Sequence, residues 1–139
     1  MIVLDTNVVS EAMKTPAESK AQVWLDRQRT ADLFMTATTF AELRLGIEIL
    51  PPNQRRNLLS AALDRVLTQT LQNRILPFDE EAARAYGRLV SRARSVGRTI
   101  QVADGQIAAI AAVRGFVVAT RDVEPFVAAG VGVVNPWEA

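Results

Sequence analysis

Four acidic residues of this sequence lie near the ends of apolar, strand-like segments. Asp5 directly follows one such run, Glu42 and Asp122 come a few residues after two others, and Asp104 opens a helix rich in alanine and isoleucine. In an α/β protein, residues that follow the strands converge at the carboxyl edge of the sheet. Clustered carboxylates repel one another unless a cation joins them, and an all-oxygen site suits Mg²⁺ or Mn²⁺. The pattern therefore predicts a metal-dependent enzyme that acts on phosphate.

Each acid also has an ordinary structural explanation, which is favoured when the acid is taken singly. Asp5 and Asp104 can cap helices, Asp122 can belong to a turn, and Glu42 can be an exposed glutamate in a salt bridge. Taken together, the four are costly in a purely structural protein, because burying one uncompensated carboxylate costs on the order of several kcal/mol. Two threonines, Thr6 and Thr120, stand beside two of the acids. Their hydroxyls either bond metal-bound water or serve as turn residues.

Composition narrows the class of protein. The 139 residues fit a single domain, 1–139, with a real hydrophobic core, and the 49% apolar and 22% charged fractions are typical of a globular chain. The chain has no cysteine and no histidine. It therefore lacks histidine-based acid–base catalysis, Ser-His-Asp and Cys-His nucleophiles, and the usual zinc sites. Residues 1–4 leave no room for a signal peptide, and no apolar stretch is long enough to span a bilayer, so we expect a cytoplasmic protein.

The positive charge is mostly arginine. Net charge is +1, and fourteen of the sixteen basic residues are Arg, a bias that suits phosphate binding and equally reflects genomic base composition. Arg84, Arg88 and Arg92 recur every four residues opposite the apolar stripe of a predicted helix, and Arg94 and Arg98 follow. This row is either a surface that binds RNA or a solvated face paired with nearby acids. RNA binding is favoured for Arg98, which is near Asp104 in the sequence.

Strands alternate with helices along the chain, which predicts an α/β fold with a central parallel sheet of four to five strands flanked by helices. The predicted strands are 2–4, 33–36, 75–77 (an edge strand), 116–119 and 131–134. The first predicted helix follows Asp5, the second follows a break at Pro16, and the third begins at a Thr38 or Thr39 cap. The next helices span 53–71, run from 79–81 to Gly97, and span 104–113 up to Gly115. A short helical turn lies near Pro125. Pro51 and Pro52 separate two of these helices, which indicates a helical hairpin.

Several segments together resemble one family. Residues 2–11 (IVLDTNVVSE), 41–47 (AELRLGI), Asp104 with 107–109, 119–122 with Phe126, and the ending 132–137 (GVVNPW) occur in the order found in PIN-domain ribonucleases. The chain resembles VapC-type toxins of toxin–antitoxin systems, and among them the FitB-like subgroup. The matches cover nearly the whole chain, so the combination is specific although each piece is weak.

The resemblance implies a PIN-like fold, with the helical hairpin as an insertion, and a pocket of Asp5, Glu42, Asp104 and Asp122 that binds one or two Mg²⁺ or Mn²⁺ ions. Asp5 and Asp104 are then the most direct metal ligands, and Glu42 and Asp122 complete the site directly or through water. A divalent ion lowers the pKa of bound water and neutralises the attacked phosphate, so RNA hydrolysis leaves a 5′-phosphate and needs no histidine.

The resemblance also implies partners. Such toxins pair with a small DNA-binding antitoxin of the VapB or FitA kind, whose tail lies in a groove and directs a basic side chain at the acid pocket, and they form homodimers. The predicted helix 53–71, with Leu50 and Leu71 near its ends, is a candidate clamp for that tail; otherwise it is a core helix or a homodimer surface.

Three other functions compete with the ribonuclease. The first is a FitAB-like regulator, in which the PIN fold acts through its DNA-binding partner with little or no nuclease activity. A phosphatase of the haloacid-dehalogenase type requires a second aspartate two residues after Asp5, where this chain has Asn7. A receiver domain requires a lysine near the last strands, but Lys14 and Lys20 are the only lysines.

Overall fold

The sheet has five parallel strands. The structure is a computed structural model that describes residues 1–15 and 19–139, so the predicted break at Pro16 lies outside the described residues. The strand order is β3-β2-β1-β4-β5, with every neighbouring pair parallel. The strands are β1 (Ile2–Leu4), β2 (Leu33–Thr36), β3 (Ile75–Leu76), β4 (Val117–Ala119) and β5 (Val133–Val134). The predicted central parallel sheet is confirmed, and β3 lies at an edge as Pro77 indicated.

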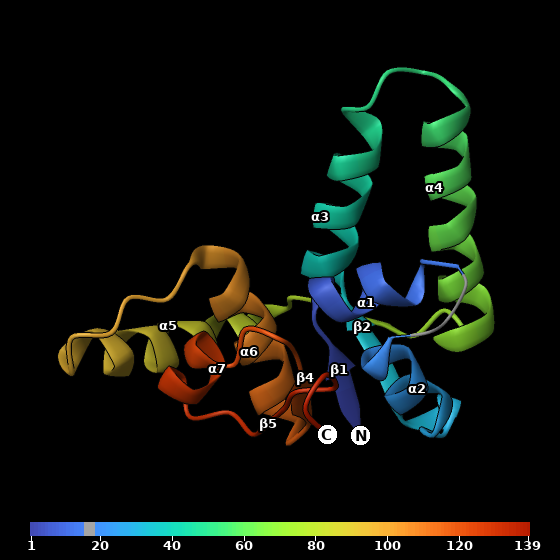
Figure 1. Cartoon of the computed structure of the whole chain (residues 1–139). Helices are drawn as coiled ribbons and strands as arrows, with labels where there is room; N and C mark the ends of the chain where they lie inside the picture. Colours follow the sequence, from blue (N-terminus) through green and yellow to red (C-terminus); the bar gives the residue numbers. More distant parts are fainter. Residues whose placement is uncertain (16–18) are drawn as a thin grey trace.

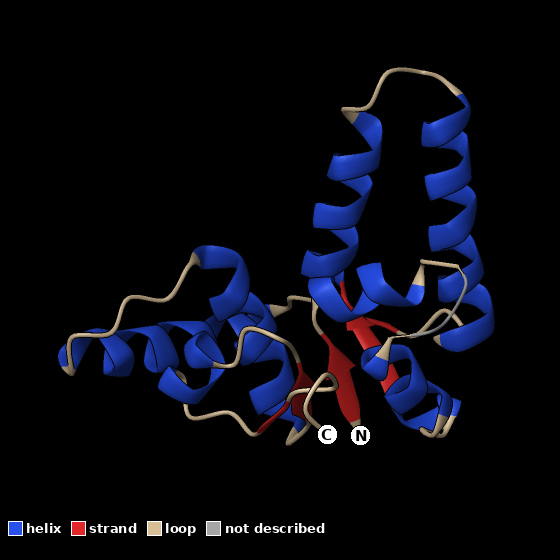
Figure 2. Ribbon diagram, in the orientation of Figure 1, coloured by secondary structure: helices blue, strands red, loops and turns tan. Residues whose placement is uncertain are grey.

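Helices cover both faces of this sheet (Figures 1 and 2). The helices are α1 (Thr6–Ala12), α2 (Lys20–Asp26), α3 (Ala37–Glu48), α4 (Gln54–Arg65), α5 (Glu80–Ser95), α6 (Val102–Arg114) and α7 (Glu124–Ala128). In Figure 1, α1 to α4 lie on one side of the sheet and α5 to α7 on the other. Short turns of 3₁₀-helix (Thr30–Asp32) and π-helix (Val66–Thr70) complete the regular structure of the described residues.

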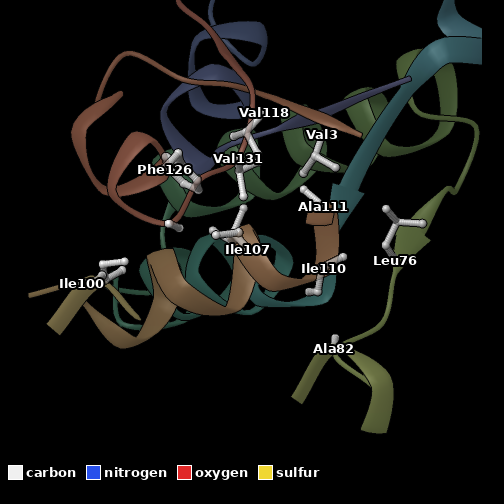
Figure 3. Close-up of a cluster of buried hydrophobic side chains, with 13 residues drawn as sticks. Val3, Leu76, Ala82, Ile100, Ile107, Ile110, Ala111, Val118, Phe126 and Val131 are labelled. Carbon is white, nitrogen blue, oxygen red and sulfur yellow. The ribbon is translucent and has the colours of Figure 1, made fainter. Parts of the chain in front are cut away.

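The alternation of side chains along the strands divides the core into two clusters. Val3 and Val118 point to the α5–α7 side, where they pack with Ile107 and Phe126 (Figure 3). Their strand neighbours point to the other side, into a cluster that includes Leu4, Ala119, Val8, Val9, Leu33, Met35, Ile47 and Leu63. Because both faces are covered, the strands are apolar on both sides, as expected for a parallel sheet.

Some predicted boundaries were wrong. The helix predicted over 53–71 has the predicted extent, but its last turn, Val66–Thr70, is π-helical. Helix α3 is capped by Thr36, whose hydroxyl accepts the Thr39 amide, and not by Thr38 or Thr39. The last strand is shorter than predicted, since Val131 packs in the core without joining the sheet. These errors share one cause: side-chain pattern predicts an element better than its ends.

Helices α3 and α4 form the predicted hairpin, which rises from the sheet in Figure 1 and turns at Pro51 and Pro52. Glu48 joins its two arms, because its two carboxylate oxygens lie 2.6 Å from guanidinium nitrogens of Arg44 on α3 and Arg56 on α4. Among the helices of residues 1–15 and 19–139, none combines the length and the apolar character that crossing a bilayer requires.

Candidate metal centre at the carboxyl edge of the sheet

Asp5 lies at the end of β1, where the chain changes direction in the strand order. The chain passes from β1 to β2 on one side and later returns to β4 on the other, so the strand order reverses between β1 and β4, the place where open α/β sheets bind ligands. The Asp5 amide donates to the Ala119 carbonyl at 2.9 Å. Only 5% of Asp5 is exposed. This aspartate is therefore a buried acid at the position where open α/β sheets bind ligands.

Three neighbours orient the Asp5 carboxylate. The Thr6 amide donates to Oδ1 at 2.8 Å, and the Thr120 hydroxyl donates to Oδ2 at 2.7 Å. The Asn7 amide group also donates to Oδ2, at 3.4 Å. Burial raises the pKa of Asp5, the bonds from Thr120 and Thr6 lower it, and the charges of Glu42 and Asp122 raise it. Because burial is the largest cause, the pKa of Asp5 is raised overall.

Asp104 lies in the first turn of α6, and its pKa is also raised. Burial, followed by the charges of Asp5, Asp122 and Glu42, raises the pKa of Asp104 to about 6. The charges of the other three predicted acids thus act on Asp104, although the four come from different elements.

Glu42 comes from the second turn of α3 and not from a strand end. Its side chain is exposed, and its Oε1 accepts a bond from the Thr6 hydroxyl at 2.8 Å. The Thr6 hydroxyl also lies 3.2 Å from that of Thr39. Thr6 thus connects the buried end of β1, through its amide, with the exposed acid on the hairpin, through its hydroxyl.

Asp122 belongs to the exposed loop after β4. Its amide donates to the Thr120 hydroxyl at 3.0 Å, and that hydroxyl in turn donates to Asp5. Asn7 holds the same loop, because its side-chain oxygen accepts the Arg121 amide at 3.1 Å. The loop that carries Asp122 is therefore tied to the start of α1 through a side chain of that helix.

The donor set of this cluster fits a hard divalent cation. Its side chains offer carboxylate and hydroxyl oxygens, and acids with raised pKa values are stabilised in their charged form by a nearby positive charge. Within residues 1–15 and 19–139, no three acidic side chains converge closely enough to form a complete set of metal ligands. Mg²⁺ does not require such a set, since it is usually held by one or two carboxylates and keeps water or phosphate oxygens at its other positions.

Sequence reasoning missed three polar residues at this edge. Asn7 was considered only as part of a family motif and as a departure from the phosphatase pattern, yet its side chain bonds Asp5, Thr120 and the Arg121 amide. The Thr38 hydroxyl donates to the Gln106 side-chain oxygen at 2.9 Å and so joins α3 to α6 beside the acids. The available signal was position, because Asn7 and Gln106 each lie two residues after one of the predicted acids.

The arginines predicted to bind RNA are not among the described residues that form this hydrogen-bond network. Arg84, Arg88 and Arg92 are exposed on α5, opposite its buried residues, and Arg84 lies 3.5 Å from Glu80. Arg98 lies 3.4 Å from Glu124 at the start of α7.

A mostly apolar groove of about 370 Å³ lies beside Glu42 where the hairpin meets α1. Met13, Leu43, Ile47 and Leu59 are among the residues that line it. The exposed apolar side chains of the hairpin are Leu45, Ile49 and Leu58. Leu71, which the sequence suggested as one end of a clamp, is fully buried in the core instead.

Comparison with known proteins assigns the chain to a family. Residues 2–130 match the PIN domain, and the chain belongs to the PIN-domain family. It is 45% identical over 138 residues to the VapC ribonuclease Y4jK of Sinorhizobium fredii, covering 99% of both chains. It is 42% identical over 137 residues to the toxin FitB of Neisseria gonorrhoeae, again covering 99% of both.

A solved structure shows the same architecture. The chain superposes on a structure of FitAB bound to an IR36 DNA fragment with a TM-score of 0.90 and 41% identity, covering 99% of this chain and 96% of that one. The resemblance to PIN-domain proteins of the VapC and FitB kind, first seen in short motifs, is thereby confirmed across the whole fold.

Proposed function

We propose that this chain is a single-domain, cytoplasmic toxin of a VapBC-type toxin–antitoxin pair, and that it is an Mg²⁺- or Mn²⁺-dependent endoribonuclease. One observation carries the proposal: at the carboxyl edge of the sheet, burial raises the pKa values of both Asp5 and Asp104, and the charges of Glu42 and Asp122 raise them further. A structural protein has no use for that repulsion, whereas a cation site does. The names of the relatives, a VapC ribonuclease and a toxin, support the same function.

Asp5 and Asp104 would hold the ion most directly, and Glu42 and Asp122 would complete the site, directly or through water. A divalent ion bound there supplies an activated water near neutral pH and neutralises the attacked phosphate. The cofactor is Mg²⁺ or Mn²⁺ because the donors are all oxygen.

The chain's own hydrogen bonds have a defined task in this proposal. Thr6 and Thr120 occupy one oxygen each of Asp5, so its carboxylate cannot rotate away from the crevice. Asn7 anchors the loop of Asp122, and Thr6 also holds Glu42. Orientation of this kind maintains the charge cluster before any ligand arrives, which reduces the reorganisation needed for the reaction.

RNA would approach along the arginines of α5 and along Arg98, which follows the end of that helix. Arg84, Arg88 and Arg92 present exposed guanidinium groups on one face, and Arg98 follows beside Glu124. One guanidinium group can donate two hydrogen bonds to two oxygens of the same phosphate, so this face suits the RNA backbone.

The cognate antitoxin would occupy the apolar groove between α1 and the hairpin. The groove has Glu42 among its lining residues, so a peptide in it can place a basic side chain at the acids. Exposed Leu45, Ile49 and Leu58 extend the apolar surface of the hairpin, and we propose that they are covered by the antitoxin or by the second subunit of a homodimer.

Sequencing of RNA 5′-phosphate ends after induction tests activity and target together. Wild-type protein should produce discrete cuts in one RNA class, while Asp5→Ala and Asp104→Asn should produce none. Asp64→Asn, an exposed acid on α4, is the matched control and should cut like wild type. Growth inhibition that persists in both site variants would contradict the enzyme.

The second candidate is a FitAB-like regulator that acts through a DNA-binding partner. The solved complex of FitAB with DNA favours it, since the chain matches that fold closely. In that case the wild-type protein would yield no cuts, and the site variants would leave DNA binding by the co-purified complex unchanged.

A further inference from the structure

Both tryptophans of the chain line one pocket outside the acid cluster. The pocket measures about 310 Å³ and lies between α2 and the C-terminal segment, where Trp24, Trp137, Lys20 and Arg27 are among its lining residues. Trp24 and Trp137 are half-buried and each packs against the core cluster on the α1–α4 side. Each indole thus has one part held by the core and another part facing the pocket. Lys20 and Arg27 are exposed.

Arg121 connects this pocket with the acid site. The Thr120 amide donates to the Val134 carbonyl, so the segment leading to Trp137 leaves the sheet at the same edge as Arg121. The Arg121 guanidinium carbon lies 4.4 Å from the centroid of a Trp137 ring. The Arg121 amide is bonded to Asn7, which contacts Asp5. A chain of two residues therefore separates the pocket from the buried acid.

We propose that this pocket binds one nucleotide of single-stranded RNA that flanks the scissile phosphate; the proposal rests on the proposed ribonuclease function. Indole rings stack on bases whatever their identity, and Lys20 and Arg27 provide the positive charge that a phosphate needs. Because Arg121 covers one face of the Trp137 ring, the base would stack on Trp24 or on the other face of Trp137. Glu138 also lines the pocket, and its carboxylate can accept from an exocyclic amino group of the base. An acidic peptide would use the cations but not the two indoles, so a nucleotide fits the whole set better.

Intrinsic fluorescence gives a direct readout, because Trp24 and Trp137 are the only tryptophans in the sequence. The full-length Asp104→Asn protein, free of metal, is titrated with single-stranded hexaadenylate and hexacytidylate. We expect saturable quenching of the tryptophan emission by the single strands. An A-form duplex of the same length should quench little, because its bases are not free to stack.

Charge variants distinguish binding of RNA in the pocket from general electrostatic attraction between RNA and the protein surface. In the Asp104→Asn background, Lys20→Gln with Arg27→Gln should raise the Kd about tenfold or more. The same double variant should lower the slope of log K against log salt by about 0.7 for each phosphate that the protein no longer neutralises. Arg55→Gln with Arg114→Gln is the matched control, since both side chains are exposed and the charge change is equal. Its Kd should stay within about twofold of the parent.

Trp137→Leu, read by anisotropy of a labelled hexanucleotide, tests the indole itself while keeping an apolar side chain at that position. It should weaken binding about tenfold or more. Three outcomes would each overturn the proposal. The charge variants and their controls could lose affinity equally, or duplex and single strand could quench the emission equally. The emission could also respond only to protein concentration, which would report a second copy of the chain.

Cleavage assays with an otherwise wild-type protein distinguish this failure from failure of the ribonuclease. The Lys20→Gln, Arg27→Gln variant should raise KM about tenfold with little change in kcat, because these two side chains are proposed to bind the flanking nucleotide equally in the ground state and the transition state. Cleavage with an unchanged KM and no quenching would refute the pocket alone. Quenching by single strands without any metal-dependent cleavage would refute the ribonuclease and leave the pocket standing.

Discussion

The two helix layers that flank the sheet are built differently. On one side, α5 and α6 pack so closely that a Cβ on Gly105 would lie 2.7 Å from a ring carbon of Tyr86. On the other, the α3–α4 hairpin extends from the sheet, is joined by an exposed cluster of Glu48 with two arginines, and leaves large apolar side chains in solvent. The first layer fixes an acid in place, and the second presents a surface that a partner can cover.

The acids of the candidate site come from both layers. Asp104 stands on α6, directly before Gly105, and feels the buried site most strongly. Glu42 stands on the hairpin, is exposed, and reaches the site through Thr6. The closely packed layer thus supplies the rigidly held acid and the hairpin layer supplies the accessible acid, while the proposed chemistry needs both. Four changes test this division.

The largest effect is expected for RNA cleavage by Asp104→Asn, which removes the acid of the tightly packed layer. Cleavage should fall at least about 100-fold, the scale seen when one charge-stabilising group leaves a hydrolytic site. Glu42→Gln on the hairpin should cost about tenfold, as expected of a group that acts through its neighbours. Initial rates with Mn²⁺ measure both. A larger loss for Glu42→Gln would reverse the proposed ranking.

The second change compares one glycine in each layer. Gly105→Ala should lower the free energy of unfolding by about 1–3 kcal/mol, because the new methyl group overlaps Tyr86. Gly46→Ala on α3 should raise it by about 0.5–1 kcal/mol, since alanine favours a helix. At Gly46 the added Cβ meets no described atom within 4 Å beyond its own helix and chain neighbours. Urea denaturation measures both, and equal effects would mean that the layers are packed alike.

The third change is pH. The pKa of Asp104 rises from 3.8 to about 6 in the folded protein, and that of Asp5 is also raised. The folded state therefore holds these protons more tightly than the unfolded state does. The contribution of Asp104 to stability is complete below about 3.8 and is lost as the pH rises through 6, and that of Asp5 acts in the same direction. In EDTA, the wild-type Tm should thus be higher by a few degrees at pH 5 than at pH 7.5.

Asp104→Asn is the control for this pH effect and should remove much of the difference in Tm between pH 5 and pH 7.5. Added Mg²⁺ should raise the wild-type Tm at pH 7.5 more than at pH 5, since the cation replaces the protons. The lowered pKa values of Glu11 and Glu48 act at more acidic pH and do not mask the trend. A Tm in EDTA that rises from pH 5 to 7.5 would argue against the charge cluster.

The smallest effect is expected for Glu48→Gln at the exposed end of the hairpin. It should lower the urea midpoint slightly at low salt and have no effect in high salt, because the pairs with Arg44 and Arg56 are screened by solvent. Glu80→Gln on α5, which removes one longer pair with Arg84, is the matched comparison and should change less. A loss that persists in high salt would show that Glu48 contributes more than a surface ion pair.

Local pattern predicted the elements well. The run 2–4, the Pro51-Pro52 turn and the Gly115 stop each appear in the structure at their predicted places, because apolar periodicity and turn residues act over short distances. Boundaries were less predictable. Thr36 caps α3 in place of Thr38 because its hydroxyl is free to accept the Thr39 amide, while the Thr38 hydroxyl bonds Gln106 across the site.

The amino-acid sequence alone specified the strands, the helices and the types of atom available for chemistry: carboxylates and hydroxyls, without histidine or cysteine. Which of these groups meet became visible only in the folded chain. The hydroxyl of Thr120 reaches Asp5 across 115 positions, and two tryptophans from opposite ends of the chain line one pocket. Long-range contacts of this kind depend on strand order and helix packing, and no local pattern encodes them because the residues that meet are neighbours only after folding.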